Sequence, residues 1–161
     1  MSIASLVAPR LMLIGPGSLA RLPEMLARLG LSRPLVVSDP FLAESGLLER
    51  ALAPLRAAGL APGLFTDTVP DPTDRVVEAG VAVLRAGDFD CLIGFGGGSP
   101  MDTAKAMAIL AAAPEGTHIR AFKVPAEADR AALPLICVPT SAGTANLLTR
   151  STAILGTAFF V

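Results

Sequence analysis

The stretch that decides the fold is DCLIGFGGGSPMDTAK, residues 90–105. Its first part, residues 90–95, is a short apolar run of the length typical of a buried strand. Three consecutive glycines follow at positions 96–98, and residues 100–113 then have the composition of a helix. A strand that enters a helix through a tight glycine loop is one unit of a parallel sheet.

The same order of elements recurs on both sides of this stretch. Apolar runs with few polar interruptions predict strands at residues 11–14, 34–37, 63–66, 90–95 and 133–138. Helical spacing predicts helices at residues 18–29, with Ser18 as the N-cap, at 41–45 and 47–58, from residue 71 or 73 to 86, and at 100–113. Because the strands are continuously apolar rather than alternating, helices should cover both faces of the sheet. We therefore predict an α/β, Rossmann-like three-layer domain with a mainly parallel sheet.

Composition and charge narrow the classes of partner. The 161 residues are 52% hydrophobic and 17% charged, with a net charge of −1 and no Trp or Tyr. This argues against a nucleic-acid partner, since neither a basic surface nor aromatic platforms for bases are present. No apolar run approaches the ~20 residues of a membrane span, and the first residues do not resemble a signal peptide. We expect no membrane partner, a cytoplasmic protein, and buried free thiols at Cys91 and Cys137.

Ligands of parallel sheets bind outside the carboxyl ends of the strands, and two loops there compete as phosphate-binding sites. The first, Gly15-Pro-Gly17-Ser-Leu-Ala20, matches G-x-G-x-x-A after a strand, although Pro16 removes one amide donor. The second is Gly96–Ser99, which leads into a helix with Ser99, Pro100 and Asp102 at capping positions. Free N–H groups at the amino end of that helix would suit a pyrophosphate.

Several other polar residues have a structural interpretation as well as a functional one. Asp39 could accept hydrogen bonds from an adenosine 2′-hydroxyl and repel a 2′-phosphate, or it could cap the helix that begins at Pro40. Lys105 follows Asp102 by three positions, as an ordinary helix-surface pair would. His118, the single histidine, lies in a polar stretch and is expected at the surface.

Two motifs resemble the signatures of a known family. GGGSPMDTAK at residues 96–105 and PTSAGT at residues 139–144 are similar to those of the iron-containing (group III) alcohol dehydrogenases. Shorter matches are VVSDP at 36–40, VPDPT at 69–73 and FKVP at 122–125, so that the resemblance covers about residues 5–149. It implies hydride transfer between a small alcohol or aldehyde and NAD.

The resemblance also implies where the cofactor NAD(H) binds. It favours the second glycine loop for the pyrophosphate, assigns the adenosine ribose to Asp39, and leaves residues 15–18 as a flanking turn. The residues it implies for cofactor binding are Asp39, Asp71, Gly96, Gly97, Gly98, Ser99, Asp102, Thr140, Ser141 and Thr144. In the family an Fe or Zn ion is held mainly by a second, helical domain. Because its ligands would lie beyond Val161, we assign no metal or catalytic residue and expect this chain alone to be inactive.

The end of the chain departs from the family pattern. The loop that usually reads PTTAGTGSEVT reads PTSAGTANLLT at residues 139–149, and residues 150–161 are unusually apolar. We therefore divide the chain into a dinucleotide-binding domain, 1–149, and an apolar tail, 150–161. Residues 153–155 and 158–161 flank Gly156-Thr157 and predict a β-hairpin. The alternative function is a non-catalytic module, engineered or a remnant, that forms a homo-oligomer through this tail.

Overall fold

The sheet of this domain has six strands in the order β1-β6-β5-β4-β2-β3. The computed structural model describes residues 11–122, residues 131–140 and the backbone of residues 156–160. All neighbouring strands in the sheet are parallel. The strands are β1 Leu11–Ile14, β2 Pro34–Val37, β3 Gly63–Phe65, β4 Cys91–Gly96, β5 Leu135–Pro139 and β6 Gly156–Phe160.

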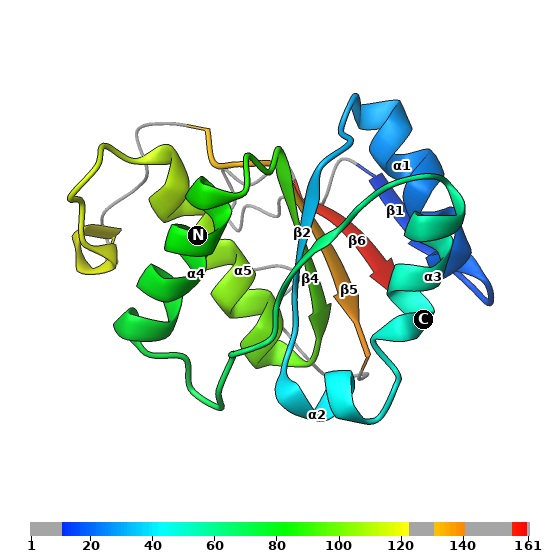
Figure 1. Cartoon of the computed structure of the whole chain (residues 1–161), viewed down its shortest axis with the longest axis horizontal. Coiled ribbons are helices and arrows are strands. Elements are labelled where there is room, and N and C mark those ends of the chain that lie inside the picture. Colours follow the sequence, from blue (N-terminus) through cyan, green and yellow to red (C-terminus); the bar gives the residue numbers. More distant parts are fainter. Residues whose placement is uncertain (1–10, 123–130, 141–155, 161) are drawn as a thin grey trace, which may run out of the picture.

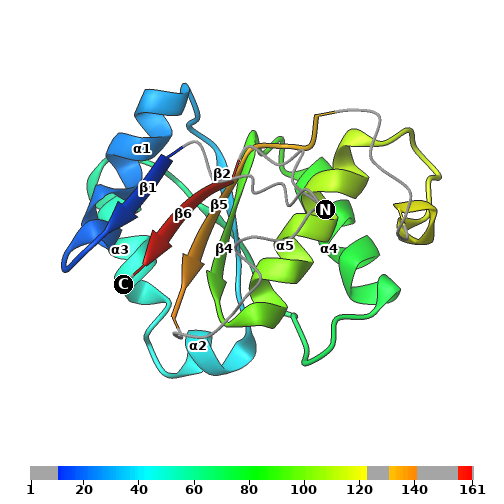
Figure 2. The same cartoon turned by 180° about the vertical axis from the view of Figure 1, so that it is seen from behind.

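Helices cover both faces of this sheet, which confirms the predicted three-layer α/β fold. Figure 1 shows α1 and α3 on one side of the sheet and α4 and α5 on the other, and Figure 2 gives the same arrangement from behind. The helices are α1 Leu22–Leu29, α2 Pro40–Glu44, α3 Glu49–Ala57, α4 Asp74–Ala86 and α5 Gly98–Ala112, with 3-10 turns η1 Ser18–Arg21 and η2 Ile119–Phe122.

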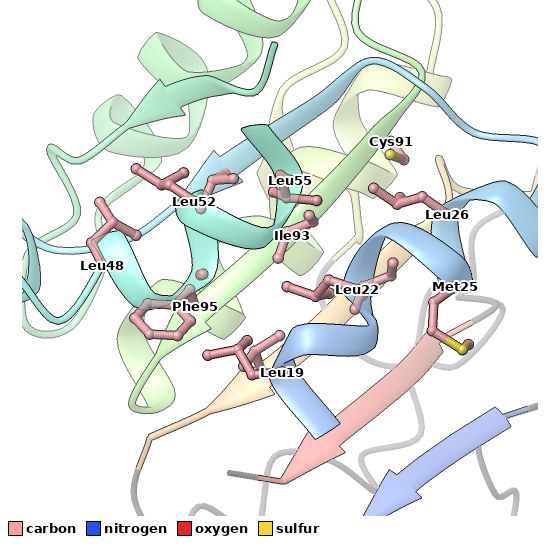
Figure 3. Close-up of a cluster of buried hydrophobic side chains, with 14 of the residues drawn as sticks. Leu19, Leu22, Met25, Leu26, Leu48, Leu52, Leu55, Cys91, Ile93 and Phe95 are labelled. Carbon is pink, nitrogen blue, oxygen red and sulfur yellow. The ribbon is translucent and has the colours of Figure 1, made fainter. Parts of the chain in front are cut away.

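Alternate residues of the central strands enter two separate cores. On the side of α1 and α3, Ile93 packs in a cluster with Leu22 and Leu55, which Figure 3 shows. On the side of α4 and α5, the neighbouring Leu92 joins a second cluster with Met101 and Met107. Every residue of β2, β4 and β5 is buried, so these strands are continuously apolar because both of their faces are covered.

The predicted hairpin around Gly156-Thr157 is wrong. Both residues belong to β6, where Thr157 pairs in register with Leu11 of β1 and with Ile136 of β5. A two-residue turn is a local signal, whereas a strand between two parallel neighbours gains backbone hydrogen bonds on both sides. Tertiary pairing therefore overrides the turn signal. Residues 153–155 lie outside the described part of the chain.

Two predicted helix caps are also wrong by one or two positions. Ser99 is the second residue of α5 rather than its N-cap, which is Gly97. Ser18 is the first residue of η1, with Gly17 at the N-cap in a left-handed conformation. Gly17 and Gly96 have positive φ values of 81° and 145°, which let the chain turn into each helix earlier than the capping preference alone predicts.

Both cysteines are buried free thiols, as predicted. Among the helices of the described residues, none has the length and apolar character needed to cross a membrane.

Candidate functional site

The sheet changes direction between β2 and β4, which are neighbours in it. From β2 the chain passes through α2 and α3 to β3, at one edge of the sheet, whereas from β4 it passes through α5 to β5, in the opposite direction. Because α3 and α5 lie on opposite faces, the connections that leave β2 and β4 run to opposite sides of the sheet (Figure 1). Such a reversal is where open parallel sheets bind their ligands.

The turn after β4 requires a glycine at position 96. Gly96 has a φ of 145°, a conformation that side chains rarely allow. A Cβ atom there would lie 2.7 Å from Cγ of Pro100 and 3.0 Å from Cδ1 of Leu42, which belongs to α2. The glycine thus lets the start of α5 and the start of α2 approach the same turn, and has a structural role beside any contact with a ligand.

The amino end of α5 has the donors that an anion needs. Among the described residues no side chain caps this helix, and its first turn contains no acidic residue. The partial positive charge of the helix end and its first N–H groups are therefore not offset by a carboxylate in that turn. Gly97, Gly98 and Ser99 are partly exposed at this end. This donor set fits the pyrophosphate of a dinucleotide.

Asp102 lies one turn further along α5. Its Oδ1 is 3.3 Å from Nζ of Lys105, so the ordinary i,i+3 pair expected from the spacing is present. The Lys105 side chain is largely buried and Asp102 is half-exposed. The pair places a positive and a negative charge together on α5, one turn after Gly98 and Ser99.

Asp39 lies two residues past the end of β2 and caps α2. Its Oδ1 accepts a hydrogen bond of 2.8 Å from the backbone N–H of Leu42, which confirms the capping interpretation. A carboxylate has a second oxygen and spare lone pairs, so capping leaves capacity for a ribose hydroxyl. The two interpretations of Asp39 are therefore compatible, and contact with ribose stays a prediction.

Two buried hydroxyl groups that the sequence analysis did not single out connect the strand ends. Ser38 Oγ donates to the carbonyl oxygen of Phe95 at 2.9 Å, and Thr68 Oγ1 donates to the carbonyl oxygen of Ser38 at 2.7 Å. Both side chains are almost fully buried. The signal available in the sequence was a hydroxyl residue directly after an apolar strand, as Ser38 is after Val37.

The remaining predicted site residues follow other strands of the sheet or lie outside the described part of the chain. The N–H of Thr140, just after β5, donates to the carbonyl oxygen of Gly96 at 2.9 Å, so these two segments lie together. Asp71 lies in the segment after β3, exposed and with a left-handed φ of 51°. Such a backbone is unusual for a residue before proline. Ser141 and Thr144 lie outside the described residues.

The competing glycine loop lies elsewhere. Residues 15–18 follow β1, which is separated from β4 by β6 and β5. Its helical continuation begins as a 3-10 turn, η1, which leads directly into α1. The loop is therefore three strands away from the point where the sheet changes direction.

His118 lies at the surface, as predicted. Its Nε2 is 3.3 Å from Oε1 of Glu78 and 3.9 Å from Oδ2 of Asp74, both on α4. Arg120 also pairs with Asp74, at 2.6 Å. These contacts hold η2 against α4 and give the histidine a structural role.

The thiols are unsuited to nucleophilic chemistry. Burial raises the pKa of the Cys137 thiol to about 11 and raises the pKa of the Cys91 thiol further. Both therefore remain protonated at neutral pH. Within residues 11–122 and 131–140, no group of three or more His, Cys, Asp and Glu side chains could hold a metal ion.

Comparison with known proteins gives one consistent result. Residues 9–158 match the family model described as iron-containing alcohol dehydrogenase. Long-chain-alcohol dehydrogenase 1 of Geobacillus thermodenitrificans is 38% identical over 151 residues, which are 92% of this chain and 38% of that protein. The NAD-dependent methanol dehydrogenase of Bacillus methanolicus is 33% identical over 150 residues, 93% of this chain and 39% of that protein.

The solved structures agree. The crystal structure of a 1,3-propanediol oxidoreductase superposes with a TM-score of 0.85 and 27% identity, over 99% of this chain and 46% of that one. The chain thus spans less than half the length of the relatives that it matches.

Proposed function

Because the chain belongs to the iron-containing alcohol dehydrogenase family, we propose that it binds NAD(H) where β2 and β4 end, as the dinucleotide-binding part of an alcohol or aldehyde oxidoreductase. The observation that carries the proposal is the amino end of α5, which no side chain of the described residues caps, at the point where the sheet changes direction. One similar protein, the methanol dehydrogenase, is NAD-dependent by name.

Each group of residues has a distinct task in this proposal. The N–H groups of Gly97, Gly98 and Ser99 bind the pyrophosphate, supported by the partial charge of the helix end. Asp39 accepts hydrogen bonds from the adenosine ribose and disfavours a 2′-phosphate by charge repulsion. Asp71, Asp102, Thr140, Ser141 and Thr144 would line the cofactor on either side.

The bound nicotinamide would supply the hydride acceptor or donor, and this chain would bind and orient it. The donor set of the described residues fits the dinucleotide but not the family's metal ion, since no ligand cluster is found among them. We therefore derive no metal-dependent step. The substrate, an alcohol or aldehyde by family, is part of the same proposal.

A titration of NADH into the purified chain, followed by NADH fluorescence, tests this function. The protein has no Trp or Tyr, so its own emission is weak. We expect saturable binding that Gly97→Asp abolishes, because a carboxylate would meet the pyrophosphate. Gly97 has an ordinary φ of −77° and aspartate is a favoured N-cap, so this variant should still fold. Absence of saturation by the folded wild-type chain would refute the proposal.

The substitution Asp39→Asn provides a second test of the proposal, because it removes the charge of the side chain. Asparagine caps a helix as well as aspartate does, so α2 should keep its start. We expect the ratio of NADH to NADPH affinity to fall by about tenfold, which corresponds to ~1.4 kcal/mol. An unchanged ratio would remove Asp39 from the site.

The second candidate, a non-catalytic module that self-associates through residues 150–161, stays a prediction. Residues 156–160 are a strand with a neighbour on each side in the same chain, which disfavours their use in pairing with a second copy. Size-exclusion chromatography with light scattering tests it. The result would favour this candidate if the chain forms a stable oligomer in the absence of NADH and also does not bind NADH.

A further inference from the structure

The carboxyl ends of β2, β3 and β4 are linked by two buried side chains rather than by the sheet alone. The register of β2 with β4 ends at the pair Val37 and Gly94. One residue further, Ser38 Oγ donates to the Phe95 carbonyl oxygen at 2.9 Å. On its other side, the backbone N–H of Ser38 donates to the carbonyl oxygen of Phe65, at the end of β3.

Thr68 holds the same residue from the β3 side. Its Oγ1 donates to the Ser38 carbonyl oxygen at 2.7 Å, and its side chain is 2% exposed. Ser38 itself has no exposed surface. The N–H, hydroxyl and carbonyl groups of Ser38 are thus all used, two of them in bonds to the β3 side and one in a bond to β4. A residue held in this way has little freedom to shift.

The two neighbours of this linkage are the two halves of the proposed site. Asp39 is joined to Ser38 by one peptide bond, and Gly96 is joined to Phe95 in the same way. The side chain of Phe95 is itself fixed in the core cluster of Figure 3, so its carbonyl group is a rigid acceptor. The Ser38–Phe95 bond therefore sets the separation between the ribose carboxylate and the phosphate-binding turn.

We propose that Ser38 and Thr68 are positioning residues for the dinucleotide, and that through Asp39 they determine the preference for NADH over NADPH. This inference rests on the proposed function. A 2′-phosphate is rejected only if the carboxylate stands at the 2′ position while the pyrophosphate is seated on α5. Loosening the linkage lets Asp39 move away, so that NADPH is disfavoured less.

The test measures affinity for NADH and NADPH in the full chain, together with the melting temperature of each variant. For Ser38→Ala we expect weaker NADH binding and a ratio of NADH to NADPH affinity that falls by about tenfold. Thr68→Val, which keeps the volume of threonine but removes its hydroxyl, should lower the ratio in the same direction. Thr68→Ser keeps the hydroxyl and should retain the wild-type ratio.

A merely structural role would give a different result. It would lower the melting temperature of the variants and leave the affinity ratio unchanged, and that outcome would overturn the inference. If Ser38→Ala does not fold, the comparison of Thr68→Val with Thr68→Ser decides the question. Failure of the wild-type chain to bind NADH would instead refute the proposed function, so the two failures are distinguishable.

Discussion

Thr103 is the one residue among those described whose buried side-chain polar atom, Oγ1, has no hydrogen-bond partner. It lies on α5 and has no exposed surface. A buried, unsatisfied hydroxyl costs about 1–3 kcal/mol, and valine has nearly the same shape and helix propensity. We therefore expect Thr103→Val to raise the free energy of unfolding by about 1 kcal/mol, measured by urea denaturation.

Thr103→Ser is the matched control for this substitution. It keeps the hydroxyl and removes the methyl group, so it leaves the polar penalty and adds a small void. The expected order of stability is Val above Thr above Ser. A valine variant no more stable than wild type would mean that the hydroxyl has a partner in the folded protein.

At the level of elements, β6 is the strand that joins the edge strand β1 to the rest of the sheet. Ala158 pairs with Met12 of β1 and with Cys137 of β5. A proline there lacks the N–H that one neighbour needs, and prolines are essentially absent from interior strands. We expect Ala158→Pro to prevent cooperative folding, as followed by circular dichroism during thermal melting.

Ala158→Gly tests the same position without removing the backbone donor. It should cost only about 0.5–1 kcal/mol. If the proline variant melted like the glycine variant, residues 156–160 would not be an interior strand in solution.

The elements differ in how far the sequence predicts them. Each of the five strands predicted by apolar runs is present, with ends shifted by at most two residues. In β2, β4 and β5, burial on both faces demands such runs, whereas β1 and β3 contain exposed residues. The place of β6 could not be predicted, since the pairing of Thr157 with Leu11 joins residues far apart in the chain. Only local signals were available there, and they indicated a turn.

The residues of the site also differ in how far the sequence predicts them. Gly96–Ser99 and Asp39 stand out because a glycine run and an acid after a strand are local patterns. Ser38 and Thr68 matter through contacts with Phe95 and with each other, across 57 and 30 positions of sequence respectively. In the sequence alone, Ser38 is an ordinary serine after a strand. Its contact with Phe95 follows only from the sheet order, which places β2 beside β4.

For the whole molecule, the strand order favours the loop at residues 96–99 over the loop at residues 15–18 as the phosphate site. The chain crosses to α3 on one face and returns through α4 and α5 on the other, as right-handed connections require when the direction along the sheet reverses. The reversal lies between β2 and β4, so a ligand there meets Asp39 and the start of α5. The loop at residues 15–18 is three strands from β4, about 14 Å at the usual strand spacing.

That distance makes the choice testable with one charge placed at either loop. A charge about 14 Å away lies beyond the Debye length of ~8 Å at physiological salt, so exposed Pro16→Glu should leave NADH affinity unchanged. Ser99→Glu places the same charge in the first turn of α5, where it favours the helix but repels the pyrophosphate. We expect it to weaken NADH binding by at least about tenfold, in the same fluorescence titration. If instead Pro16→Glu abolished NADH binding and Ser99→Glu left it unchanged, the phosphate would bind at the first loop. The proposal that the ligand binds between the ends of β2 and β4 would then be wrong.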